Sequence, residues 1–82
     1  MSTQEKILSV LDQALGLKGR TQTFDASTPL LGALPELDSL GVVKLIANLE
    51  ESFRISIDDD EIDGTVFETV QSLSDFIDAK IS

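Results

Sequence analysis

The stretch 39–53 can bury its apolar residues efficiently only as a helix. They recur there at intervals of three and four residues, after a loop that contains Pro29, Gly32 and Pro35. We expect an amphipathic helix with a buried stripe made of Leu40, Val43, Ile46, Leu49 or Ala47, and Phe53. Its other side carries Gly41, Lys44, Asn48 and Glu51. Such a stripe needs partner helices to cover it.

The flanking sequence predicts those partners. Ser2 and Glu5 have capping-box spacing before an apolar pattern that Gly16 ends: Ile7, Leu8, Leu11, Ala14 and Leu15. Thr69 is the predicted N-cap of a last helix that buries Val70, Leu73, Phe76 or Ile77, and Ile81, and exposes Ser74, Asp75, Asp78 and Lys80. The acids of residues 58–61 suit the start of a short helix. The sequence predicts one all-α domain, residues 1–82, a bundle of three main helices and one short helix.

Residues 17–37 show no helical periodicity, so we expect a long loop between the first and second helices. Thr28-Pro29 and Leu34-Pro35 exclude a continuous helix, because proline lacks an N–H donor and restrains the residue before it. Apolar side chains are expected to tie this loop to the core: Phe24, Leu30, Leu31, Leu34 and Leu37.

Charge and composition exclude several functions. The 82 residues carry a net charge of -9 and include no cysteine and no histidine, which rules out disulfides and the usual zinc ligands. Nucleic-acid binding needs a basic surface, so we expect protein partners with basic docking surfaces. The start of the chain has no basic or apolar leader, and no apolar run reaches the roughly 20 residues of a membrane span. We expect a cytoplasmic monomer.

The acidic stretch from Asp59 imitates an EF-hand calcium loop. Glu61, Asp63 and Gly64 fall at the third, fifth and sixth positions, but the twelfth position is Val70 where the motif needs glutamate. We therefore predict no specific metal site. A loose divalent site that relieves acidic repulsion is the alternative.

Ser39 stands where the loop meets the second helix. Asp38 is expected to be the N-cap or to lie just before it. The Ser39 hydroxyl is then exposed at a helix N-terminus, where free N–H groups and the helix dipole favour a phosphate. Ser39 therefore suits the attachment of a phosphodiester. A catalytic role is not expected, because the chain has no histidine base and Leu37-Asp38-Ser39-Leu40-Gly41 lacks the first glycine of a nucleophile elbow.

Leu37-Asp38-Ser39-Leu40, followed by Leu-Ile-Ala-Asn-Leu-Glu-Glu-Ser-Phe at residues 45–53, resembles the acyl carrier proteins. The resemblance covers nearly the whole chain. It implies a 4'-phosphopantetheine arm on Ser39, installed from coenzyme A by a phosphopantetheinyl transferase. The thiol of such an arm holds an acyl group as a thioester for acyl-loading and acyl-using enzymes.

In that family the second helix is the main docking surface. We expect partner contacts at Asp38, Leu40, Lys44, Ala47, Glu50 and Glu51. The apolar stripes can also form a cavity for a medium-length acyl chain, with Leu40, Val43, Ile46, Phe53, Leu73, Phe76 and Ile77 as its lining.

The pathway stays open at this point. Gly41 and Lys44 stand where fatty-acid carriers commonly have acids, so lipid, polyketide and other secondary biosynthesis are all considered. Asp-Ser-Leu-Gly also resembles the D-alanyl carriers, and residues 31–39 resemble carriers of exosortase and exopolysaccharide gene clusters. An unmodified acidic interaction module, with Ser39 as an ordinary cap, is the alternative of another class.

Overall fold

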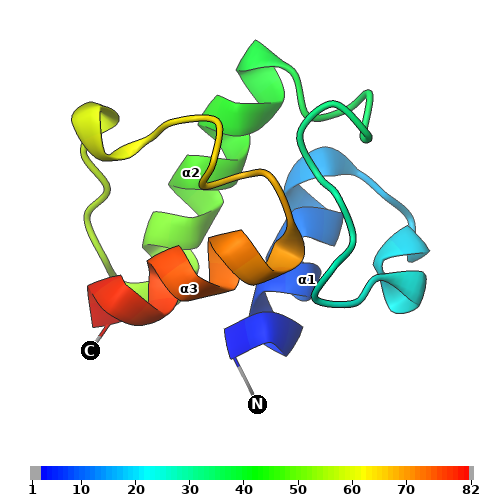
Figure 1. The fold of residues 1–82 in the computed structure, drawn as a ribbon, viewed down its shortest axis with the longest axis horizontal. Helices are drawn as coiled ribbons and strands as arrows, with labels where there is room; N and C mark the ends of the chain where they lie inside the picture. Colours follow the sequence, from blue (N-terminus) through cyan, green and yellow to red (C-terminus); the bar gives the residue numbers. More distant parts are fainter. Residues whose placement is uncertain (1–2, 82) are drawn as a thin grey trace.

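The computed structural model describes residues 3–81, and these form three α-helices and two short 3₁₀ helices (Figure 1). The α-helices are α1 (Thr3–Leu15), α2 (Ser39–Phe53) and α3 (Val70–Ile81). The 3₁₀ helices are η1 (Arg20–Thr23), within the long connection, and η2 (Asp59–Glu61), between α2 and α3. The predicted all-α fold is confirmed. Helix η1 was not predicted from the sequence, and the predicted cap Ser2 lies outside the described residues.

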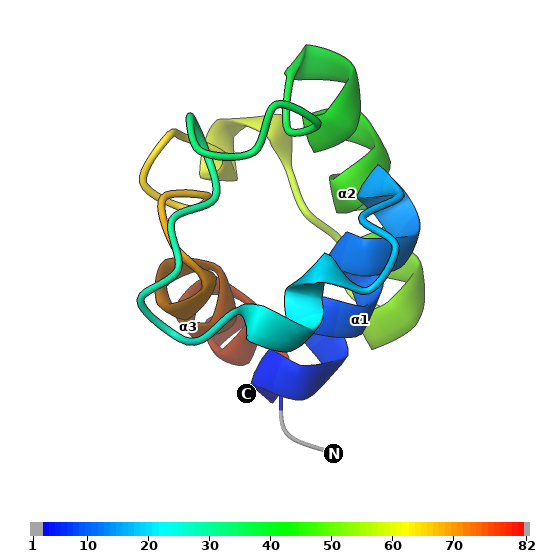
Figure 2. The same ribbon diagram turned by 90° about the vertical axis from the view of Figure 1, so that its right-hand side faces the viewer.

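Helix α1 packs against both α2 and α3, which approach each other less closely (Figure 2). The core lies among the three helices and the loops that join them. Its largest fully buried side chains come from all three helices and from the long connection: Ile7, Leu11, Leu17, Leu30, Leu45, Leu49, Val70, Leu73 and Ile77. No helix within residues 3–81 has the length and apolar character needed to cross a bilayer.

The long connection is held by backbone hydrogen bonds as well as by apolar side chains. Residues 26–31 lie alongside residues 67–71, as Figures 1 and 2 show. Four bonds join them, in which the N–H groups of Leu30, Leu31, Val70 and Gln71 donate to the carbonyl oxygens of Glu68, Phe67, Thr28 and Ala26. Leu30 and Leu37 are buried as predicted, whereas Leu31 is 44% exposed, so its predicted anchoring role is wrong.

The buried side of α2 differs from the predicted stripe. Its buried residues are Gly41, Leu45 and Leu49, whereas Leu40 is 70% exposed and Val43 is 63% exposed. Apolar residues occur almost all around the first two turns, so periodicity alone allowed two rotations of this helix. The packing of the loop against Gly41 selects the other rotation.

Helix α3 begins as predicted. The N–H of Ser72 donates to Thr69 Oγ1 (3.1 Å), and Ser72 Oγ accepts from the N–H of Thr69 (3.0 Å). Two predictions for this helix are wrong, because Ser74 is buried and Ile81 is 47% exposed. Ser74 lies one turn after Val70, on the face that the helix buries, whereas Ile81 lies in the last turn.

Candidate functional site

Asp38 fixes the point at which α2 begins. Its backbone is extended (φ −99°, ψ −167°), and its Oδ1 accepts a hydrogen bond of 2.8 Å from the N–H of Gly41. The N–H of Val42 donates to the Asp38 carbonyl oxygen, also at 2.8 Å. This is the geometry of an N-cap, so the predicted role of Asp38 is confirmed.

Ser39 is the first residue of α2, and it is exposed. Its hydroxyl makes no hydrogen bond with any residue that the structure describes. Within residues 3–81, the N–H groups of Ser39 and Leu40 also have no acceptor. An accessible hydroxyl beside free N–H donors at the positive end of a helix dipole fits a phosphodiester.

Gly41 brings the preceding loop onto the first turn of α2. A Cβ on Gly41 would lie 2.2 Å from the carbonyl oxygen of Glu36 and 3.2 Å from Leu15 Cδ2, which leaves no room for a side chain. Gly41 was predicted on the exposed side of the helix, and this prediction is wrong, because Gly41 is buried. This close approach sets the path of Leu37 and Asp38, the two residues between Glu36 and Ser39.

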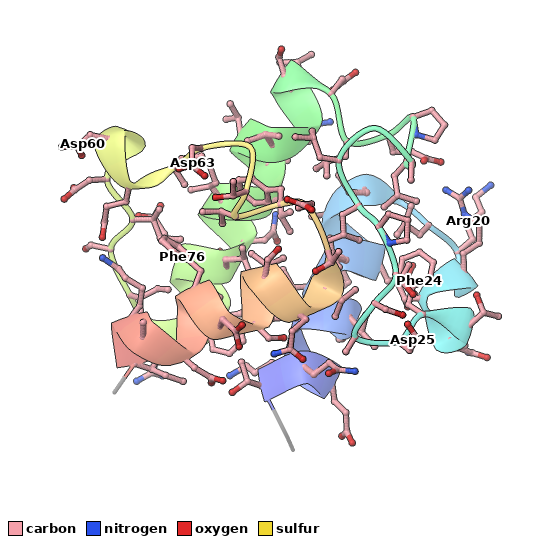
Figure 3. The ribbon with its side chains drawn as sticks, in the orientation of Figure 1. Arg20, Phe24, Asp25, Asp60, Asp63 and Phe76 are labelled. Atoms are coloured by element: carbon pink, nitrogen blue, oxygen red, sulfur yellow. The ribbon has the colours of Figure 1, made fainter. Side chains whose placement is uncertain are left out.

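The loop is held from its other side by an ion pair. Arg20, in η1, donates to Glu36 Oε2, and Figure 3 shows Arg20 on the side of the molecule that carries η1. The N–H of Gly19 donates to both carboxylate oxygens of Asp12, at 3.2 and 3.1 Å, and so joins this part of the loop to α1. The contact of Glu36 with Gly41 and its pairing with Arg20 together position the loop that leads to Ser39.

The exposed face of α2 contains most of the predicted partner-contact residues. Leu40, Lys44, Ala47 and Glu51 are exposed on α2, and Asp38 is exposed just before it. Glu50 differs, because it is half-buried and its Oε2 accepts a hydrogen bond of 2.8 Å from the N–H of Ile57. Glu50 therefore holds the loop after α2, and its predicted contact with a partner stays a prediction.

Val43 was missed as a surface residue. It lies between Leu40 and Ala47 at positions i, i+3 and i+7, so these three side chains share one face. The signal for this placement was Gly41: once a glycine is assigned to the buried side of a helix, Val43 must lie on the opposite side.

Only some of the residues predicted to line an acyl cavity lie in the interior. Leu73 and Ile77 are fully buried in the core, and Ile46, Phe53 and Phe76 pack against it. Figure 3 shows Phe76 on the side of α3 that faces the segment between α2 and α3. Leu40 and Val43 do not belong to this interior, because both point into solvent. This correction follows from the rotation of α2.

The acidic segment between α2 and α3 is organised by internal bonds. Asp63 Oδ1 accepts from the N–H of Thr65 (2.9 Å) and from its hydroxyl, and the pKa of Asp63 is lowered by these bonds. Lys80 donates to both oxygens of Glu61 at 2.8 Å, which lowers the pKa of Glu61. Asp60 and Asp63 lie apart (Figure 3), and within residues 3–81 no three acids, histidines or cysteines converge as metal ligands would.

Two comparisons with known proteins bear on this site. Residues 5–77 match the model of a family described as a phosphopantetheine attachment site. The fold is similar to the solution NMR structure of a holo acyl carrier protein from Nitrosomonas europaea, with a TM-score of 0.89. The two chains are 46% identical over 96% of this chain and 95% of the other. This chain therefore belongs to the acyl carrier proteins, which carry 4'-phosphopantetheine and serve enzymes without being enzymes themselves.

Proposed function

We propose that Ser39 carries the 4'-phosphopantetheine arm and that the protein presents an acyl group on it to partner enzymes. One observation carries this proposal: the Ser39 hydroxyl is exposed, makes no hydrogen bond within the described chain, and stands on the first residue of α2. The arm, when bound, supplies a thiol that holds the acyl group as a thioester. The chain has no cysteine that could do this.

The residues around Ser39 prepare it for modification. Asp38 fixes the first turn of α2, and the contact between Gly41 and Glu36 fixes the loop before it. A transferase therefore meets a hydroxyl on a rigid element. The free N–H groups of Ser39 and Leu40 stabilise negative charge on an attached phosphodiester.

The exposed face of α2 supports a partner set that differs from that of the usual fatty-acid carriers. Leu40, Val43 and Ala47 give this face an apolar strip, and Lys44 lies beside it. An exposed lysine repels a basic docking surface, whereas the apolar strip can be buried by any complementary partner. We therefore propose a pathway of lipid, polyketide or other secondary biosynthesis whose enzymes rely more on apolar contact.

The structure removes one argument for a D-alanyl cargo. The glycine of Asp-Ser-Leu-Gly suggested that class, but Gly41 is explained by its close contact with the Glu36 backbone. The side chains of Ile46, Leu73 and Phe76 lie in or against the core, where they can cover an acyl chain. Each CH₂ group removed from water contributes about 0.8 kcal/mol, a gain that an alanyl group hardly obtains.

Intact-mass spectrometry tests the attachment. The purified protein is incubated with coenzyme A, magnesium and a broad-specificity phosphopantetheinyl transferase. We expect the parent to gain one phosphopantetheine and Ser39→Ala to gain none. Ser56→Ala, which removes another exposed serine, serves as the control and is expected to be modified like the parent. Modification of Ser39→Ala would refute the assignment.

A further inference from the structure

A surface pocket of about 250 Å³ lies where the end of α1 meets the beginning of α2. Asp38 and Leu40, the two neighbours of Ser39, both line it. Ala14 and Leu15 line it from α1, and Gly41 and Lys44 line it from α2. The pocket is therefore adjacent to the proposed attachment point, but on the α1 side of α2 and separate from the interior between α2 and α3.

The walls of this pocket are largely apolar. Leu15 and Ala14 are half-buried and pack against the core, whereas Leu40 is exposed. Gly41 contributes no side chain, because the Glu36 carbonyl oxygen takes the place where its Cβ would stand. The pocket offers methyl groups on both helices to an apolar occupant.

Two polar groups in the pocket lack partners. Glu36, whose Oε2 pairs with Arg20, has a second oxygen, Oε1, that is shielded from solvent and accepts no hydrogen bond from the described residues. The ammonium group of Lys44 forms no hydrogen bond or ion pair with any residue from 3 to 81. Glu36 Oε1 is thus a shielded acceptor without a partner, which is unusual, whereas the exposed ammonium group of Lys44 is free to donate to an occupant.

These groups select the chemistry of the occupant. A cation is disfavoured by Lys44, and an anion is disfavoured by Glu36 and Asp38. A neutral chain with amide groups satisfies both, because an amide N–H or a hydroxyl donates and an amide carbonyl accepts. Methyl and methylene groups between the amides fit the apolar walls.

We propose that the pantetheine part of the arm on Ser39 lies in this pocket. Lys44 donates to one of its carbonyl oxygens, and its geminal methyl groups pack on Leu15 and Ala14. An N–H or O–H group of the arm donates to the Glu36 carboxylate once that side chain turns its shielded Oε1 toward the pocket. This inference rests on the proposed function, because it requires the arm on Ser39. A tether this short gives the occupant a local concentration of about millimolar or more, so weak contacts suffice to populate the site.

Nuclear magnetic resonance of the holo protein tests the proposal. The labelled protein is modified with unlabelled coenzyme A, and nuclear Overhauser effects are recorded between the arm and the protein. We expect contacts from the geminal methyl protons of the arm to the methyl groups of Ala14 and Leu15, and shifts of both residues between the apo and holo forms.

Matched substitutions separate the pocket from the rest of α2. Ala14→Leu fills the pocket, and we expect it to abolish these contacts and to move the arm signals toward those of free pantetheine. Ala79→Leu adds the same volume at an exposed position of α3, outside both the pocket and the α2 face, and is expected to change neither the contacts nor the arm signals. Lys44→Met provides a second test that does not depend on Ala14→Leu keeping its fold, because Lys44 is exposed. We expect it to weaken the contacts between the arm and the pocket.

Failure of the pocket assignment can be distinguished from failure of the proposed carrier function. A holo mass with no contact and no shift at Ala14 and Leu15, or with contacts to Val42 and Ile46 in their place, would overturn the pocket assignment and leave the carrier role intact. Absence of any mass gain would overturn the proposed function and this inference together.

Discussion

Substitution of Gly41 by alanine tests the contact that positions the loop before Ser39. The new Cβ would lie 2.2 Å from the carbonyl oxygen of Glu36. Close carbon-to-oxygen contacts in proteins are about 3.3 Å or longer, so the loop backbone must move by about 1 Å. Leu15 Cδ2, at 3.2 Å, restricts the escape of the methyl group on another side.

Two effects of opposite sign decide the outcome. Alanine stabilises a helix interior relative to glycine by about 1 kcal/mol. Overpacking typically costs about 1–3 kcal/mol, and a backbone carbonyl cannot rotate away as a flexible side chain can, which places this site at the upper end. We expect a net loss of about 1–2 kcal/mol in the free energy of unfolding. For a domain of this size, that lowers the melting temperature by about 4–16 °C.

Urea and thermal unfolding, followed by far-ultraviolet circular dichroism, measure this change. Gly64→Ala is the matched control, because a Cβ there would meet only Leu31 Cδ2 at an ordinary 3.7 Å. We expect little change in the control. A Gly41→Ala variant as stable as the parent, or more stable, would show that helix propensity dominates and that the loop does not depend on the close approach.

Three further substitutions probe the cap, the docking face and the loop after α2. Asp38→Ala removes the cap of α2 and is expected to cost about 1 kcal/mol in urea unfolding; an unchanged midpoint contradicts this. Lys44→Glu is expected to speed loading by a fatty-acid synthase transacylase, and an unchanged rate removes charge as the determinant of partner choice. Lys80→Met removes the ammonium that lowers the pKa of Glu61. A lowered carboxyl pKa stabilises the fold only while the group is ionised, so the stability difference from the parent should be full above about pH 4.3 and vanish as the pH falls through the folded pKa. Equal urea midpoints for Lys80→Met and the parent at neutral pH would refute a stabilising role for the pair of Lys80 and Glu61.

The helices and their starts were predictable because their signals are local. Asp38 and Thr69 stand directly before apolar helical patterns, and each makes the capping bond that its position predicts. The prolines of the long connection likewise act on their immediate neighbours. The same local signals place the Ser39 hydroxyl at an exposed helix start.

What could not be predicted depends on contacts between distant residues. Leu40 and Val43 were assigned to the interior because periodicity does not distinguish them from Val42 and Leu45. The choice was made by the close approach of Glu36 to Gly41, which no pattern within α2 reveals. Ser74 was assigned to solvent from its polarity, yet its hydroxyl is buried and has no partner among the described residues.

The backbone bonds between residues 26–31 and 67–71 give an irregular part of the chain the behaviour of a small sheet. The amide hydrogens of Leu30 and Gln71 are therefore expected to exchange slowly with solvent. Leu30 lies outside any helix, and Gln71 lies in the first turn of α3, where an N–H group has no acceptor within the helix. These bonds join segments about 40 residues apart, so they form only after the chain between them has closed. We therefore expect the loop that leads to Ser39 and the start of α3 to open and close as one cooperative unit, so that a cut in either segment releases both.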